Sequence, residues 1–208
     1  TPLSLLYLII FRIYRYSKSE ISSEIPIICV GNLTVGGAGK TPTVIEIRRI
    51  FKKDFKNIFV LSRGYKGSEK GPMLVKYDSK INEVGDECKI HAQHGLTCIS
   101  KNKVNGAKFC ARNGGELIIM DDGLQSVDVE KKIKILVIDE NYNFGNEKIF
   151  PSGPLREPIK ESLERANIII VIGEKKSYFH KHIPKEKLFF AKKLINKKNL
   201  KKRKLFVF

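Results

Sequence analysis

The residues best suited to chemistry form a glycine-rich stretch in the first quarter of the chain. Residues 31–41 read Gly-Asn-Leu-Thr-Val-Gly-Gly-Ala-Gly-Lys-Thr and follow the apolar run 27–30, which is typical of a buried parallel strand. Glycines let backbone N–H groups approach a polyphosphate, and the start of the next helix adds free N–H donors. Lys40 would reach the β- and γ-phosphates, and Thr41 would place its hydroxyl on Mg²⁺. The stretch therefore predicts a nucleotide-phosphate cradle.

One position departs from the usual phosphate-loop pattern. That pattern has a glycine five residues before the Gly of Gly-Lys-Thr, where this chain has Thr34. Gly36 and Gly37 offer the flexibility that the missing glycine would give. The alternative is a glycine-rich turn that binds nothing. The order of apolar strand, glycines and Lys-Thr favours nucleotide binding.

Two acidic pairs could complete such a site. Asp121 and Asp122 end the apolar run 117–120, and a carboxylate at a strand end can hold Mg²⁺ directly or through water, although a single acid there often caps the next helix. Asp86 and Glu87 follow a glycine. They indicate either a helix N-terminus or a carboxylate that deprotonates an acceptor hydroxyl. The spacing alone favours the helix N-terminus for this second pair.

A rigid turn supplies the last candidates. Residues 151–158 read Pro-Ser-Gly-Pro-Leu-Arg-Glu-Pro, and prolines on both sides limit its motion. Arg156 could clamp a phosphate with two hydrogen bonds. The alternative is a surface ion pair between Arg156 and Glu157, which contributes little.

The apolar runs predict a doubly wound, mostly parallel sheet flanked by helices. Strands are expected at 27–30, 58–61, 117–120, 133–138 and 168–172, with an edge strand at 73–77, and helices at 43–53, 86–94, 103–112 and 159–166. Such sheets bind ligands at the carboxyl ends of their strands. Residues 31–41, 62–65 and 121–122 all fall there.

Composition bounds the possible functions. The 208 residues are enough for one sizeable core or for one domain plus part of a second. Cys29, Cys88, Cys98 and Cys110 show no Cys-x-x-Cys pairing, which argues against zinc and disulfides and favours reduced, buried thiols. The formal net charge of +17 suggests a polyanionic partner, although a Lys-rich composition explains much of it.

The two ends of the chain have contrasting compositions. Residues 3–14 are nearly all apolar but too few to span a bilayer, so they indicate either an interfacial helix or a helix packed on the core. Residues 181–204 hold eleven Lys or Arg against one acid, Glu186. Few aromatic residues interleave with these charges, which disfavours a nucleic-acid-binding module.

Taken together, the motifs resemble the tetraacyldisaccharide 4′-kinases, the lipid A 4′-kinases of Gram-negative bacteria. The matching pieces lie in the family's order between about residues 3 and 172, and the family also has the unusual Thr34. They are residues 30–42, 61–65, 84–87, 120–125, 144–146 and 151–158.

The resemblance implies a P-loop nucleotide-binding fold, with ATP and Mg²⁺ as cosubstrates, and phosphoryl transfer to the 4′-hydroxyl of a tetraacylated glucosamine disaccharide 1-phosphate. It makes Asp86 the acceptor-activating residue, which reverses the interpretation from spacing. The site residues that it implies are as follows: catalytic Asp86, Lys40, Arg156 and Glu157; nucleotide-binding Thr34, Val35, Gly36, Gly37, Ala38, Gly39, Lys40 and Thr41; metal-binding Thr41, Asp121 and Asp122; substrate-binding Ser62, Arg63, Tyr65 and Glu87.

The resemblance also implies an organisation and a location. Residues 1–20 would form a membrane-facing helix, residues 21–180 the kinase core, and residues 181–208 a basic segment that begins a truncated second lobe. We expect the chain to act at the cytoplasmic face of the inner membrane, on an acylated disaccharide lipid, with no nucleic acid and no protein partner.

Two departures from the family motivate a second hypothesis. The family's second lobe carries a histidine thought to assist the catalytic aspartate, and none of His91, His94, His180 and His182 lies in the matching context. Ser126 stands where the family often has His or Asn. The alternative to a working lipid kinase is therefore a nucleotide-binding remnant without full activity.

Overall fold

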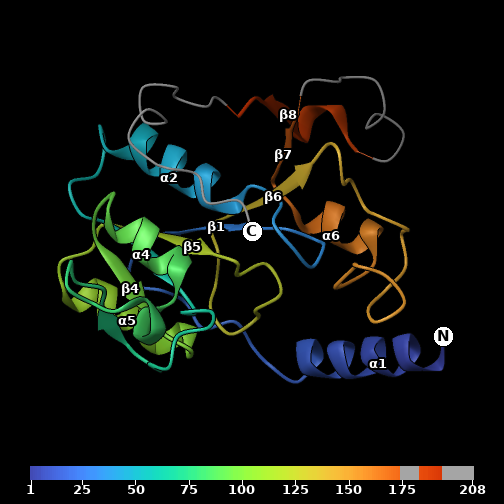
Figure 1. The fold of residues 1–208 in the computed structure, drawn as a ribbon, viewed down its shortest axis with the longest axis horizontal. Coiled ribbons are helices and arrows are strands. Elements are labelled where there is room, and N and C mark those ends of the chain that lie inside the picture. Colours follow the sequence, from blue (N-terminus) through green and yellow to red (C-terminus); the bar gives the residue numbers. More distant parts are fainter. Residues whose placement is uncertain (174–182, 194–208) are drawn as a thin grey trace, which may run out of the picture.

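Strand β1 (Ile27–Gly31) lies near the centre of one eight-stranded sheet, which the computed structural model shows with helices on both faces (Figure 1). The structure describes residues 1–173 and 183–193. The strand order is β3-β4-β2-β5-β1-β6-β7-β8. Neighbouring strands run parallel except β3 and β4. The mostly parallel, doubly wound sheet that the sequence predicts is confirmed.

The strands that carry the site are buried on both faces. Every residue of β1, β2 and β5 is buried, as their unbroken apolar sequences require. The other bounds are β2 (Ile58–Ser62), β3 (Met73–Leu74), β4 (Thr97–Ile99), β5 (Leu117–Asp121), β6 (Ile133–Asp139), β7 (Ile168–Ile172) and β8 (Leu188–Ala191).

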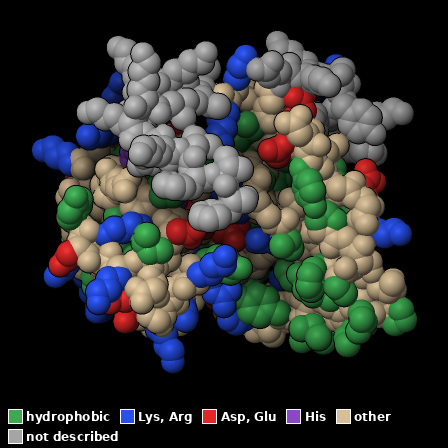
Figure 2. Space-filling view, viewed as in Figure 1, with side chains coloured by type: hydrophobic (Ala, Val, Ile, Leu, Met, Phe, Trp, Pro, Cys, Tyr) green, Lys and Arg blue, Asp and Glu red, His purple; other side chains and the backbone are tan. Residues whose placement is uncertain are grey.

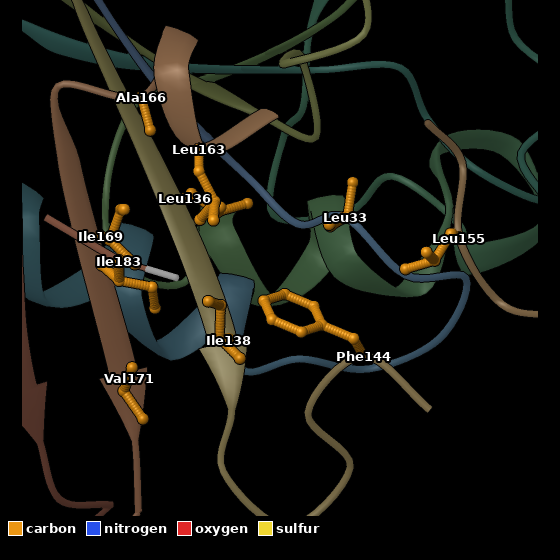
Figure 3. Close-up of a cluster of buried hydrophobic side chains, with 10 residues drawn as sticks. All are labelled: Leu33, Leu136, Ile138, Phe144, Leu155, Leu163, Ala166, Ile169, Val171 and Ile183. Carbon is orange, nitrogen blue, oxygen red and sulfur yellow. The ribbon is translucent and has the colours of Figure 1, made fainter. Parts of the chain in front are cut away.

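Helices cover both faces of the sheet. Their bounds are α1 (Pro2–Tyr16), α2 (Lys40–Phe51), α3 (Ile81–Val84), α4 (Asp86–Ala92), α5 (Lys103–Arg112) and α6 (Ile159–Arg165), with a 3-10 turn, η2, at Lys185–Lys187. Val44 and Ile47 of α2 pack on one face of the central strands, where α4 also contacts α2. Ala107 of α5 packs on the opposite face. Leu163 of α6 joins a third cluster on β6 and β7, shown in Figure 3.

The sequence missed two strands and one helix. Thr97–Ile99 is too short for a residue pattern to reveal, and it forms β4 through pairing with β2. Leu188–Ala191 lies in the basic segment, yet it pairs in parallel with β7 at the edge of the same sheet. Helix α3 spans only Ile81–Val84. His180, His182, residues 205–208 and most of the basic segment lie outside the described residues.

Helix α1 packs against the rest of the molecule through polar contacts. Ser4, its one buried residue, donates to the carbonyl of Ile149 at 3.0 Å. Tyr7 donates to the carbonyl of Arg156 at 3.0 Å, and Arg12 pairs with Glu161 of α6 at 3.0 Å. Across the described residues, no helix is both long enough and apolar enough to cross a bilayer.

Most apolar side chains of α1 point outward, although Leu8 and Phe11 are half-buried. Six leucines and isoleucines are between 47% and 63% exposed, and they form the α1 patch: Leu3, Leu5, Leu6, Ile9, Ile10 and Ile13. Figure 2 shows hydrophobic side chains gathered over this part of the molecule. The helix is therefore oriented opposite to an ordinary amphipathic helix, which buries its apolar face.

Arg48 joins three segments that underlie the site. This buried α2 residue donates to the carbonyls of Ile58 at 2.7 Å and His91 at 3.3 Å, and to that of Leu96. Burial lowers its pKa to about 10, so it remains a cation at neutral pH. It ties α2 to the start of β2 and to the end of α4.

Replacing Arg48 with methionine should destabilise the fold by about 3 kcal/mol, because methionine fills similar space but leaves buried carbonyls without donors. Urea unfolding measures the change. Arg49→Met is the matched control, since the exposed Arg49 pairs with Glu46 on its own helix, and its cost should stay within about 0.5 kcal/mol. Equal losses in the two variants would contradict the bracing role of Arg48.

Candidate functional site

The glycine loop is shaped by Asn32, the first residue after β1. Asn32 is fully buried, and its amide nitrogen donates to the carbonyls of Thr34 at 2.7 Å and Gly36 at 3.2 Å. Its amide oxygen accepts from Lys40 Nζ at 3.0 Å. One side chain thus fixes both the path of the loop and the position of the lysine.

Gly39 is the N-cap of α2 and needs to be a glycine. Its φ is +84°, in the left-handed region, and a Cβ there would lie 2.5 Å from Cδ1 of Ile172. The loop therefore packs directly on the end of β7. Helix α2 begins at Lys40 and Thr41, so its free N–H groups and positive end face the loop.

The first half of the loop pairs with the proline-rich turn. The Val35 N–H donates to the carbonyl of Pro154 at 2.8 Å, and the Arg156 N–H donates to that of Leu33 at 2.9 Å. Thr34 and Leu155 form an antiparallel bridge between them. This short ladder is what brings Arg156 beside the loop, although the two segments are far apart in sequence.

Asp121 and Asp122 diverge at the end of β5. Successive strand residues face opposite sides of a sheet, and Asp121 lies on the same side as Leu117 and Ile119, which pack towards α2. Its Oδ2 lies 2.9 Å from Nε2 of His91, on α4. Asp122 has a φ of +55°, which turns the chain and sends its side chain elsewhere.

Asp122 is the acid that meets the loop lysine. Its Oδ1 lies 3.6 Å from Lys40 Nζ. Arg156 Nη1 donates to both of its oxygens, at 2.9 and 3.0 Å. The structure therefore brings together residues predicted from three separate motifs: the loop, the acidic pair and the proline-rich turn.

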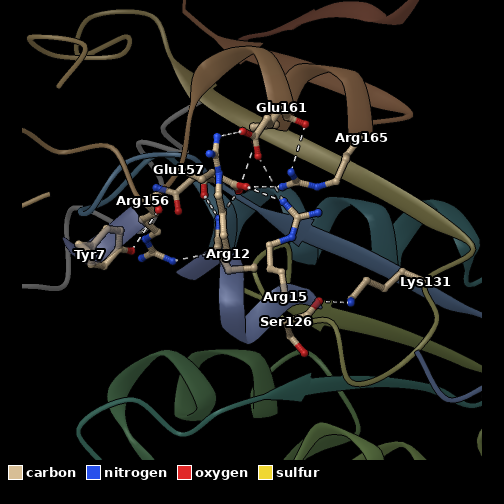
Figure 4. A network of polar contacts seen from close by, with 12 residues as sticks. Tyr7, Arg12, Arg15, Ser126, Lys131, Arg156, Glu157, Glu161 and Arg165 are labelled. Atoms are coloured by element: carbon tan, nitrogen blue, oxygen red, sulfur yellow. Dashed lines mark hydrogen bonds and ion pairs between the residues drawn. The ribbon is translucent and has the colours of Figure 1, made fainter. Parts of the chain in front are cut away.

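Glu157 lies behind this group instead of facing it. It is fully buried, and one oxygen accepts from the Gln125 amide at 3.1 Å while the other pairs with Arg165 of α6 and, at 3.8 Å, with Arg15 of α1 (Figure 4). Through these contacts Glu157 ties α1 and α6 to the site. Its direct participation in catalysis stays a prediction.

The acidic pair at the start of α4 sits against the loop after β2. Gly85 is the N-cap, and a Cβ on it would lie 2.3 Å from the carbonyl oxygen of Tyr65, so the two backbones touch. Asp86 is exposed and accepts from the Glu87 N–H at 2.9 Å. Arg63 and Tyr65 are exposed beside this pair, whereas Ser62 is buried.

Glu87 is electrostatically linked to the loop and the acids of β5. Burial raises its pKa first, and the carboxylate of Asp121 raises it further, while Lys40 lowers it. Glu87 and the Lys40–Asp122 pair therefore share one electrostatic environment. This places α4 beside the phosphate loop.

Sequence reasoning passed over three residues of the site. Asn32 follows the first buried strand, and Gln125 closely follows the acidic pair. Both lie within motifs that the sequence analysis quoted, and that position was the signal that could have identified them. His91 was set aside because it lacks the family's context, yet it contacts Asp121. No local pattern could have revealed that contact, because the two residues are thirty positions apart.

Comparisons with known proteins agree with the geometry. The sequence model of the family described as tetraacyldisaccharide-1-P 4′-kinase matches residues 1–205. A tetraacyldisaccharide 4′-kinase of Paramagnetospirillum magneticum is 41% identical over 175 residues, covering 83% of this chain and 54% of that protein. One from Afipia carboxidovorans is 39% identical over 160 residues, covering 77% and 48%.

The fold also matches a solved structure. A crystal structure of LpxK from Aquifex aeolicus in complex with ATP has a TM-score of 0.78 to this chain at 27% identity, covering 91% of this chain and 62% of that one. The chain spans about half the length of the curated relatives it matches.

The raised pKa of Glu87 predicts a pH-dependent stability. Because the folded state holds this proton more tightly than the unfolded state, ionisation of Glu87 costs stability as the pH rises from the unfolded pKa, about 4.3, through the raised one. Glu87→Gln should therefore unfold at a higher temperature than the parent chain near pH 7, and this advantage should vanish below about pH 4.

Thermal unfolding across pH checks this, with Glu46→Gln as the contrasting variant. The Arg49 partner lowers the pKa of Glu46, so removing that carboxylate should cost, not add, stability at neutral pH. A Glu87→Gln variant less stable than the parent near pH 7 would show instead that the carboxylate is held by a favourable contact.

Proposed function

Because the chain belongs to the tetraacyldisaccharide-1-P 4′-kinase family, we propose that it binds ATP and takes part in phosphoryl transfer to the 4′-hydroxyl of a tetraacylated glucosamine disaccharide 1-phosphate. The observation that carries the proposal is the meeting of Lys40, Asp122 and Arg156 at the mouth of the glycine loop. A turn that bound nothing would have no need of this charged group.

The loop and α2 would bind the triphosphate. Backbone N–H groups of residues 36–40 would cradle its oxygens, and the positive end of α2 favours the negative charge. Lys40 is held in place by Asn32 and reaches the edge of the sheet where Asp122 stands. Arg156 would stabilise charge on the transferred group, since its guanidinium can make paired hydrogen bonds to phosphate oxygens.

The residues also fit Mg²⁺. Asp121 is 1% exposed, and its Oδ1 is buried without a hydrogen-bond partner, so that oxygen is available to a cation or its water. Thr41 and Asp122 offer the other hard oxygen ligands. No cluster of three or more His, Cys, Asp or Glu side chains that could hold a metal occurs in residues 1–173 and 183–193. When bound, the ion would neutralise charge on the phosphates.

Asp86 is the residue that we assign to the acceptor. It is exposed at the first position of α4, beside Arg63 and Tyr65, where a sugar hydroxyl could approach. Its carboxylate would accept the hydroxyl proton as that oxygen bonds to the γ-phosphorus and the bond to ADP breaks. Glu87, whose pKa burial raises, interacts electrostatically with both Lys40 of the loop and Asp86.

The α1 patch supports action at a membrane surface. Six exposed Leu and Ile side chains on one helix form an apolar surface that a soluble monomer rarely shows. Arg12 stands on the same helix and is 57% exposed beside its partner Glu161, so it could also meet a lipid phosphate. An acylated substrate leaves a bilayer at a cost of about 0.8 kcal/mol per CH₂, so the enzyme should come to it. We place the chain at the cytoplasmic face of the inner membrane.

Two substitutions should separate binding from transfer. Lys40→Ala should weaken ATP affinity at least about tenfold, because it removes a charge-assisted contact with phosphate. Asp86→Asn should keep ATP affinity but slow transfer by about 10²–10⁴-fold. The assay follows label from ATP to the tetraacyl disaccharide 1-phosphate by thin-layer chromatography, with ATP affinity measured by calorimetry.

Lys52→Ala, at the far end of α2, is the matched control and should change neither quantity. ATP binding without any labelled lipid product would favour the alternative, a nucleotide-binding unit that does not transfer phosphate. Absence of ATP binding by the parent chain would reject both.

The membrane proposal predicts that the double variant Leu6→Glu, Ile10→Glu binds vesicles of phosphatidylethanolamine and phosphatidylglycerol at least about tenfold more weakly. Each substitution removes an apolar side chain whose burial in the bilayer would contribute about 1.5–3 kcal/mol to the binding free energy. Vesicle sedimentation measures the change. Ile50→Glu, exposed on α2, controls for the added charge and should have little effect. Unchanged sedimentation of the double variant would refute the role of the α1 patch.

A further inference from the structure

We propose that His91 is a positioning residue that holds Asp121 in the orientation in which its second carboxylate oxygen faces the metal. Nε2 of His91 lies 2.9 Å from Oδ2 of Asp121, and the two side chains are 0% and 1% exposed. The proposal rests on the proposed function, because it gives Asp121 its role through Mg²⁺.

The hydrogen-bond pattern sets the direction of this contact. Oδ1 of Asp121 and Nδ1 of His91 are both buried and have no hydrogen-bond partner among the described residues, so Nε2 and Oδ2 make the hydrogen bond of this pair. A carboxylate can only accept, so Nε2 must carry the hydrogen and donate it. Donation to Oδ2 occupies that oxygen and leaves Oδ1 as the one buried oxygen of Asp121 free to meet a cation.

The backbone of His91 is held by a second contact, with Arg48 of α2. Its backbone carbonyl accepts from Nη1 of Arg48 at 3.3 Å, and Arg48 lies on the helix that begins with Lys40 and Thr41. His91 therefore links the helix of the phosphate-binding lysine to the strand of the acid. A shift of α4 relative to α2 would lengthen or break the hydrogen bond between His91 and Asp121.

Burial alone does not explain why a histidine stands here. The neighbouring Val84 and Cys88 form an apolar cluster, and an apolar side chain at 91 would avoid burying an unpaired ring nitrogen. That side chain would, however, leave Asp121 with no donor at all. Groups that hydrogen-bond a metal-binding side chain typically change metal affinity 10–100-fold when they are removed.

Two variants with the same side-chain amide group but different lengths provide the test. In His91→Gln the side-chain amide nitrogen reaches about as far as Nε2, whereas in His91→Asn it reaches only as far as Nδ1. We expect His91→Asn to weaken Mn²⁺ binding about 10–100-fold in the presence of a non-hydrolysable ATP analogue, and His91→Gln to remain within a few fold of the parent chain. Electron paramagnetic resonance of free Mn²⁺ gives the affinity without any turnover.

His94→Asn is the matched control, since His94 is exposed beyond the end of α4. Affinity of the analogue without metal should stay unchanged in all three variants, which separates a metal effect from a general loss of the nucleotide site. Equal weakening of Mn²⁺ binding in His91→Gln and His91→Asn, or no weakening in either, overturns the positioning role. Failure of the parent chain to bind Mn²⁺ with the analogue overturns the proposed function as well.

Discussion

The site depends on one constraint, the parallel pairing of β1 with β5. Because the two strands run in the same direction and in register, with Val30 opposite Asp121, the glycine loop and the acidic pair leave the sheet at the same edge. Parallel β2 brings the 62–65 loop to that edge as well. The burial of these three strands on both faces keeps them inside the sheet, where helices cover both sides.

Charge is balanced within the site by a small set of side chains. Lys40 and Arg156 meet Asp122, while Asn32 holds the lysine through a neutral amide. The cations and acids are therefore close enough to act on one phosphate group, yet each is restrained by another residue. Such preorganisation is what phosphoryl transfer requires of a protein, because positioning and electrostatics supply most of the catalysis.

Helix α1 shows how a polar interface can leave an apolar face outward. Its serine, tyrosine and arginine side chains contact the turn before α6 and α6 itself, and Glu157 joins this interface to the site through Gln125. Helix α1 and the phosphate loop are thus linked by direct contacts that run from Arg15 through Glu157 and Gln125 to the carbonyl of Asn32. A substrate held at the surface through its acyl chains would meet a site attached to the same helix.

The sequence by itself determined the five longer strands, the glycine loop and the resemblance to the kinase family, because apolar runs and the Gly-Lys-Thr turn are local patterns. It could not reveal β4 or the pairing of β8, since three or four residues carry no reliable periodicity. Only the tertiary structure separated Asp121 from Asp122, through the pleat and a positive φ, and moved Glu157 behind the site. The contact between His91 and Asp121 was likewise decided by packing, because α4 meets the end of β5 only once the helix has docked on that face of the sheet.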